Sequence, residues 1–203
     1  MKTFVRNLSI IACLFFSFSV VAQKSPSPPP GTVLLKPSKT EEKHATFIDI
    51  WPLTVMDWLE YMYWTEKEYG TESVEYKAIL PDTLMGSQSY PENWRHPTCR
   101  NFPMIGISYE QATAYCKWRA DKVNEQLKLK KKKYTVSYSM PTETDLKEAF
   151  KQWKITYCYP FDLPVNELTA EKTVMIKGWN LSFEPYQGAS TTVGFRCVAE
   201  IHK

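Results

Sequence analysis

Hydrophobic and polar residues follow the periods of helices and short strands along most of the chain. Between residues 54 and 69 apolar residues recur at steps of three and four, which predicts a helix. Thr54 can cap this helix by accepting a hydrogen bond from the backbone of Asp57, and Gly70 offers a C-terminal stop. Its inward positions are predicted to be Val55, Trp58, Leu59, Met62 and Tyr63.

Two further segments have helical periodicity. One begins at Ser108, with Gln111 at the capping-box position, and continues to about residue 127. Its predicted buried stripe is Ala112, Tyr115, Cys116, Ala120, Val123 and Leu127. The other follows Pro141 and is capped by Thr142. Its predicted inward residues are Leu146, Ala149 and Phe150.

Short runs rich in β-branched and aromatic residues predict strands between these helices. The runs occupy residues 45–50, 134–139, 155–159, 173–176 and 193–201. Residues 23–30 carry four prolines and are predicted to form a stiff, solvated linker. No second Pro- or Ser-rich break follows, so residues 31–203 are predicted to form one α+β domain.

Residues 1–22 have the pattern of a cleaved export signal. Lys2 and Arg6 precede an apolar run, and small residues occupy the −3 and −1 positions of a cut after Ala22. The run is shorter than the ~20 residues of a membrane span. A rival interpretation is a lipoprotein signal ending at Cys13, although the apolar run before it is short. We expect a periplasmic, outer-membrane-associated or secreted protein, with membrane attachment only if Cys13 is lipidated.

Composition and charge narrow the class of partner. The 203 residues are 43% hydrophobic and 23% charged, as in globular proteins, and the formal net charge is +3. Removing residues 1–22 takes away two of the 25 basic residues and none of the 22 acidic ones, which leaves +1. This small charge does not indicate a nucleic-acid partner.

Four cysteines remain after such a cut, and an even number in an exported chain predicts two disulfides. Three pairings of Cys99, Cys116, Cys158 and Cys197 are possible. Helix periodicity turns Cys116 inward, and Cys197 lies on a C-terminal strand of the kind that packs against such a helix. This favours a bridge between Cys116 and Cys197, and Cys99 would then pair with Cys158. The spacings contain no CxxC pair, which argues against a zinc site.

Two surface features could bind a partner. Five lysines occupy positions 128 and 130–133, where a solvated turn is favoured over an anionic-lipid or polyanion site. Aromatic residues also cluster on the first predicted helix, most of them expected in the core. Of these, Trp58, Tyr61 and Trp64 are the candidates for an exposed binding surface.

Several segments, in order, match one family. The sequence PMIGISYEQA, extended by AYCKW through residue 118, resembles the start of the long helix of the formylglycine-generating-enzyme-like (sulfatase-modifying-factor) family. YSMPTE at 138–143 and GFRCV at 194–198 resemble its PTE turn and closing strand, and weaker echoes occur at 29–34, 47–54, 165–169 and 175–178. The resemblance spans residues 29–199. It implies a C-type-lectin-like α+β fold with two to three helices on short, mostly antiparallel strands.

In that family a helix cysteine bonds the cysteine of the final strand, which here implies Cys116 and Cys197. The compact exported form is also similar to domains of bacterial gliding-motility and type IX secretion lipoproteins. The resemblance therefore implies an accessory role in motility or protein secretion at the cell envelope.

Departures from the family pattern bear on catalysis. Catalytic members hold copper with a cysteine pair near the C-terminus and oxidise a substrate cysteine to formylglycine, but residues 179–193 contain no cysteine. The calcium segment is reduced to residues 151–163 with one acid, Asp162, whereas calcium takes about six to eight oxygen ligands. We therefore expect no cofactor and no catalytic residue, and a binding or structural module for an envelope protein or glycan. The alternative is a formylglycine-generating oxidoreductase acting on protein cysteine.

Overall fold

The computed structural model describes residues 27–36, 45–82, 94–153, 165–176 and 181–202. The predicted signal segment, Cys13, Cys158 and the strand predicted at 155–159 lie outside the described residues. The predicted linker needs one correction. Pro29 is buried, and its carbonyl accepts hydrogen bonds from the backbone N–H and hydroxyl of Thr32, so the packed domain already includes Pro29.

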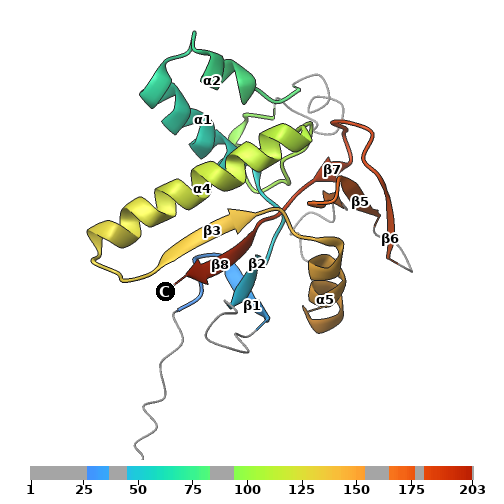
Figure 1. The fold of residues 1–203 in the computed structure, drawn as a ribbon. Helices are drawn as coiled ribbons and strands as arrows, with labels where there is room; N and C mark the ends of the chain where they lie inside the picture. Colours follow the sequence, from blue (N-terminus) through green and yellow to red (C-terminus); the bar gives the residue numbers. More distant parts are fainter. Residues whose placement is uncertain (1–26, 37–44, 83–93, 154–164, 177–180, 203) are drawn as a thin grey trace, which may run out of the picture.

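The first sheet contains four antiparallel strands in the order β1-β2-β8-β3. They are β1 (Thr32–Lys36), β2 (Thr46–Asp49), β3 (Thr135–Ser139) and β8 (Val198–His202). The N-terminal strands and the C-terminal strand therefore lie side by side (Figure 1). This arrangement brings residues about 150 positions apart into contact, so the sheet closes the two ends of the domain onto each other.

The second sheet has the order β6-β5-β4-β7. Its strands are β4 (Asn166–Leu168), β5 (Thr173–Ile176), β6 (Ser182–Pro185) and β7 (Val193–Gly194). The β4–β7 pair is parallel and the other pairs are antiparallel. The single strand predicted at 193–201 is wrong, because the chain leaves the second sheet after Gly194 and enters the first at Val198. Between them, the carbonyls of Phe195 and Cys197 accept hydrogen bonds from the backbone N–H groups of Leu53 and Asp49, respectively.

The helix boundaries confirm the capping signals. Helix α1 (Val55–Tyr69) begins after a capping box between Thr54 and Asp57, and Gly70 ends it with a φ of 86°. Helix α4 (Tyr109–Leu129) begins after a second capping box, in which Ser108 and Gln111 exchange hydrogen bonds of 2.9 and 3.1 Å. Each box satisfies two backbone N–H groups that the first helical turn would leave unpaired.

The other helices are shorter. Helix α5 (Glu143–Trp153) follows Thr142 as predicted. Helix α2 (Val74–Ala78) and the 3-10 turn Pro97–Cys99 were not predicted, since a single turn is too short to produce a periodic pattern. None of the helices in the described ranges has the length and apolar character needed to cross a membrane.

The core lies between α1, α4 and the first sheet, with α5 against β1 on the other side (Figure 1). On α4 the predicted stripe is buried at Ala112, Tyr115 and Cys116 but only half-buried farther along, where the helix extends toward the edge of the molecule. Tyr63, predicted inward on α1, is exposed and packs on Trp64 instead. The α+β class predicted from the sequence describes this arrangement.

Candidate binding groove and buried cysteine pair

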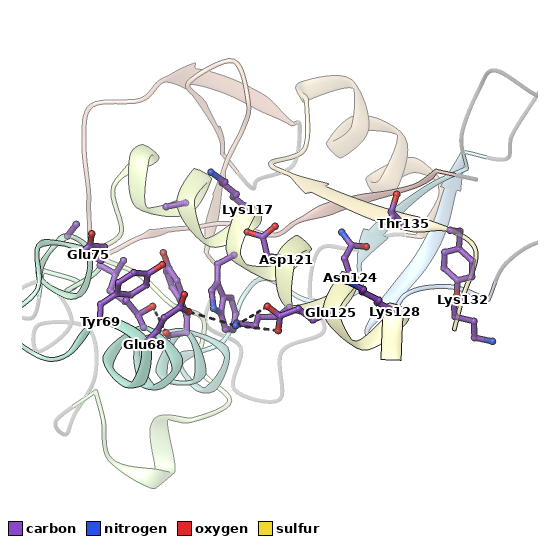
Figure 2. Close-up of a pocket in the computed structure, with 18 residues that line it drawn as sticks. Glu68, Tyr69, Glu75, Lys117, Asp121, Asn124, Glu125, Lys128, Lys132 and Thr135 are labelled. Carbon is purple, nitrogen blue, oxygen red and sulfur yellow. Dashed lines mark hydrogen bonds and ion pairs between the residues drawn. The ribbon is translucent and has the colours of Figure 1, made fainter. Parts of the chain in front are cut away.

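A groove of about 950 Å³ runs between α1, α2 and α4 and reaches the start of β3. We call it the α1–α4 groove. Figure 2 shows it extending along α4, with Glu68, Tyr69 and Glu75 at one end and Lys128 and Lys132 at the other. Its volume lies within the ~300–1,000 Å³ range of small-molecule and cofactor pockets. The groove brings aromatic and charged side chains together on one concave surface.

Aromatic side chains form the middle of the groove. The rings of Tyr61 and Trp118 lie 4.9 Å apart, and Tyr115 packs beneath both. Burial, with a smaller contribution from the charge of Tyr69, raises the pKa of Tyr61 to about 12, so its phenol stays protonated. Within the described ranges the buried indole Nε1 of Trp118 has no hydrogen-bond partner. This part of the groove therefore presents a largely apolar aromatic surface.

Charges are distributed unevenly along the groove. At the acidic end the hydrogen bond that the phenol of Tyr69 donates to Glu68, the largest of several causes, raises the pKa of Tyr69. In the middle Lys122 is paired with Glu125 at 3.4 Å and lies 4.0 Å from Glu68. At the basic end neither Lys128 nor Lys132 forms an ion pair with any described residue. The groove thus has one acidic end and one end with uncompensated positive charge.

The structure divides the predicted aromatic surface. Trp58 is fully buried at the centre of the core and is not a surface residue, which corrects that expectation. Tyr61 is also buried, although one side of it lines the groove. Only Trp64 is exposed, at 45%, and Lys122 lies over its ring at 5.8 Å. The reason is helix phase, because Trp58, Tyr61 and Met62 share the face of α1 that meets α4.

Sequence reasoning missed most of the groove. Charged residues at 117, 121, 125 and 128 recur on one face of α4, a pattern that solvated helix faces share. The pattern alone does not show that α1 and α2 stand opposite that face. Trp118, in the same segment as the cysteine motif, is the one residue whose size and polarity could have indicated a site there.

The described cysteines are all buried. The sulfur atoms of Cys116 on α4 and Cys197 before β8 lie 3.4 Å apart, and Cys99, the last residue of the 3-10 turn, lies in the core. Burial, together with hydrogen bonding to Cys116, raises the pKa of the Cys197 thiol well above its usual value. The thiolate is the form that attacks electrophiles and binds metals, so this environment disfavours both.

An ion pair fixes the position of the cysteine pair. Arg119 donates two hydrogen bonds to Asp49, of 2.7 and 2.9 Å, and Asp49 also accepts one from the backbone N–H of Cys197. Arg119 in turn lies over the ring of Tyr138 at 4.4 Å. The carboxylate at the end of β2 therefore holds α4 and the final strand together beside the two sulfur atoms.

Oxidation is expected to join Cys116 to Cys197. A covalent bond needs the sulfur atoms to approach by about 1.3 Å, which side-chain rotation can provide. The bond would close a loop of 81 residues, and in the chain-entropy model a loop of that size stabilises a fold by about 4 kcal/mol. The pairing of Cys99 with Cys158 stays a prediction, since Cys158 lies outside the described residues.

Peptide mapping of the oxidised, unreduced protein measures this pairing. We expect a linked pair of peptides carrying Cys116 and Cys197, and a lower midpoint of urea unfolding after reduction. A Cys99→Ser variant serves as control and should keep the same link. Alkylation of both Cys116 and Cys197 in oxidised, denatured protein would show that the pairing is wrong.

Comparison with known families agrees with the ordered motifs. The family model for the sulfatase-modifying factor enzyme 1-like domain matches residues 17–192, most of the chain. No curated protein and no solved structure matches this chain. The chain belongs to the formylglycine-generating, sulfatase-modifying-factor domain family.

The described residues differ from the copper centre of catalytic family members in the chemistry of their thiols. The three described thiols are buried, and the pKa of Cys197 is raised rather than lowered. No three His, Cys, Asp or Glu side chains in the described ranges converge as a metal site. Copper needs exposed, readily ionised thiolates to meet a substrate cysteine. The described residues do not fit that role.

Proposed function

We propose that this chain is an exported, non-catalytic binding module of the family, which holds a polypeptide segment of a partner protein in the α1–α4 groove at the cell envelope. The observation that carries the proposal is the groove itself, with an aromatic middle and oppositely charged ends. An accessory role in gliding motility or secretion is part of the proposal, and the resemblance to those lipoprotein domains supports it.

The buried thiols support a non-catalytic role. A family oxidase must bring a substrate cysteine to its own cysteines, and Cys116 and Cys197 lie inside the core between α4 and the first sheet. Among the described residues, an ion pair and an aromatic ring pack beside them, and the two cysteines are no more than 2% exposed. The groove is separate from them, because neither cysteine is among the residues that line it.

The charges favour a polypeptide over a neutral glycan. A neutral sugar can stack on Tyr61 and Trp118 but has no use for uncompensated lysines. A peptide with a basic residue at one end and an acidic residue at the other would pair with Glu75 and with Lys128 and Lys132, respectively. An apolar side chain between them would cover the aromatic middle. Complementary charges at both ends would also fix the direction of the chain.

Selection from a random peptide library tests this function. We expect selected peptides to carry basic and acidic residues at opposite ends of an apolar centre. In calorimetry, Lys128→Gln with Lys132→Gln should weaken their binding about tenfold, because two exposed ion pairs of up to ~1 kcal/mol each are lost together. The control, Lys77→Gln with Lys172→Gln, removes two exposed lysines outside the groove and should leave binding unchanged.

Two results would contradict the proposal. One is the absence of peptides whose binding depends on the groove lysines. The other is activity of the alternative kind: stoichiometric copper binding together with oxidation of a cysteine-containing sulfatase peptide. The first result would leave the groove without a role. The second would favour the oxidoreductase interpretation.

A further inference from the structure

The turn from α4 to β3 carries the highest concentration of one charge in the described chain. Residues 128–133, here named the lysine turn, are all exposed and include five lysines. None of these lysines forms an ion pair with a described residue, whereas Lys77, Lys147 and Lys172 elsewhere are each paired with a glutamate. The turn lies at the end of α4 that is distant from β7 (Figure 1).

Hydrogen bonds hold the turn in one conformation. The backbone N–H groups of Lys130 and Lys132 donate to the carbonyls of Gln126 and Leu127, at 3.0 and 2.9 Å. Lys131 adopts a left-handed conformation, with a φ of 52°, which ends the helix. Because the backbone is already ordered, a partner that meets the turn does not have to order it, and binding loses less conformational entropy.

Leu129 lies among these lysines and is 75% exposed. Its neighbour Leu127 packs against the core, but Leu129, the last residue of α4, does not. Lysines near a helix C-terminus stabilise the helix dipole, which accounts for one or two of them. The helix dipole does not account for all five lysines, nor for the exposed apolar side chain of Leu129 among them.

We propose that the lysine turn docks onto an anionic lipid bilayer. The ammonium groups of Lys130, Lys131 and Lys133 would pair with phosphate headgroups, and Leu129 would enter the boundary with the acyl chains. A soluble polyanion would use the lysines equally well but would offer nothing to Leu129, and this residue decides for a lipid surface. None of these four residues lines the α1–α4 groove, so the proposal goes beyond the peptide-binding function and does not depend on it.

Vesicle sedimentation of the full processed protein tests the docking. The protein should sediment with vesicles of equal parts phosphatidylglycerol and phosphatidylcholine, and less of it should do so as the salt concentration is raised. Pure phosphatidylcholine vesicles should bind it little or not at all. Replacing Lys130, Lys131 and Lys133 by Gln should weaken partition about 100-fold, since each lysine at an anionic surface contributes ~1 kcal/mol. Apolar contacts made elsewhere on the protein would bind both vesicle types equally, so the difference between them isolates the charged turn.

Two matched comparisons separate docking from general charge. Lys77→Gln, Lys147→Gln and Lys172→Gln together remove the same charge from equally exposed sites and should leave partition within about twofold of the starting protein. Leu129→Ser should weaken vesicle binding about tenfold but leave binding to soluble polyphosphate unchanged. Equal losses in the two lysine triples, an unaffected Leu129→Ser protein, or no preference for anionic vesicles would each overturn the proposal.

Discussion

Glu167→Gln is expected to lower the free energy of unfolding by about 3–5 kcal/mol, the range for breaking a buried ion pair. Glu167 on β4 is fully buried and accepts from Arg196 at 2.5 and 2.7 Å. The amide of the variant could accept only one of these hydrogen bonds. Its NH₂ group would face a guanidinium N–H, and the buried cation would lose its counter-charge.

The pair connects the two sheets of the domain. Glu167 belongs to the second sheet, and Arg196 lies where the chain passes from β7 to β8. Arg196 also donates to the carbonyls of Asp49 and Ile50, at 2.8 and 3.2 Å, where β2 of the first sheet ends. One guanidinium therefore satisfies acceptors in both sheets, and the crossing of the chain depends on its position.

Urea unfolding followed by tryptophan fluorescence measures the loss. Glu72→Gln is the matched control, because Glu72 pairs with Lys77 at the surface, and exposed pairs contribute only ~0–1 kcal/mol. Replacing both Glu167 and Arg196 by apolar residues should not restore stability, since two backbone carbonyls would lose their donor. Equal midpoints for Glu167→Gln and Glu72→Gln would show that the pair does not stabilise the crossing.

Local chemistry explains which parts of the fold could be predicted. The capping boxes at Thr54 and Ser108 involve residues three positions apart, so sequence alone placed both helix starts. Strand β5 and the approach of Cys116 to Cys197 followed from short patterns and helix phase. Each of these predictions depended on neighbours along the chain or on one helix face.

Features that depend on distant segments were not predicted. The division of residues 193–201 between two sheets is set by partners such as Glu167 and Asp49, which no local pattern reveals. The groove exists because α1 and α2 stand opposite the charged face of α4, and that placement follows from packing of the whole core. Trp58 was predicted to lie on a binding surface because aromatic residues occur on both faces of α1, and only packing against α4 decides which of them are buried.

Trp58→Ala is expected to lower the free energy of unfolding by about 3–5 kcal/mol, as for other large-to-small changes of buried aromatic residues. The Trp58 ring is fully buried, stacks on Tyr115 at 5.7 Å and meets Phe195 edge to face at 6.3 Å. Its indole N–H donates to the carbonyl of Ile79 at 3.2 Å. The variant would leave a cavity between α1, α4 and the crossing segment, and an acceptor without its donor.

Thermal and urea unfolding of two variants on α1 measure whether Trp58 acts through the core or at a surface. Trp64→Ala removes a ring that is 45% exposed, and it should change the free energy of unfolding by less than about 1 kcal/mol. Should Trp58→Ala fail to fold, Trp58→Phe keeps the aromatic contacts and loses chiefly the indole hydrogen bond, for a loss of about 1–3 kcal/mol. If Trp58→Phe and Trp64→Ala are equally stable and both weaken peptide binding, Trp58 belongs to the binding surface. We expect instead that Trp58→Phe is less stable than Trp64→Ala and that the folded variant binds peptide as the starting protein does. The reason is that α1 turns Trp58 toward α4 and Phe195.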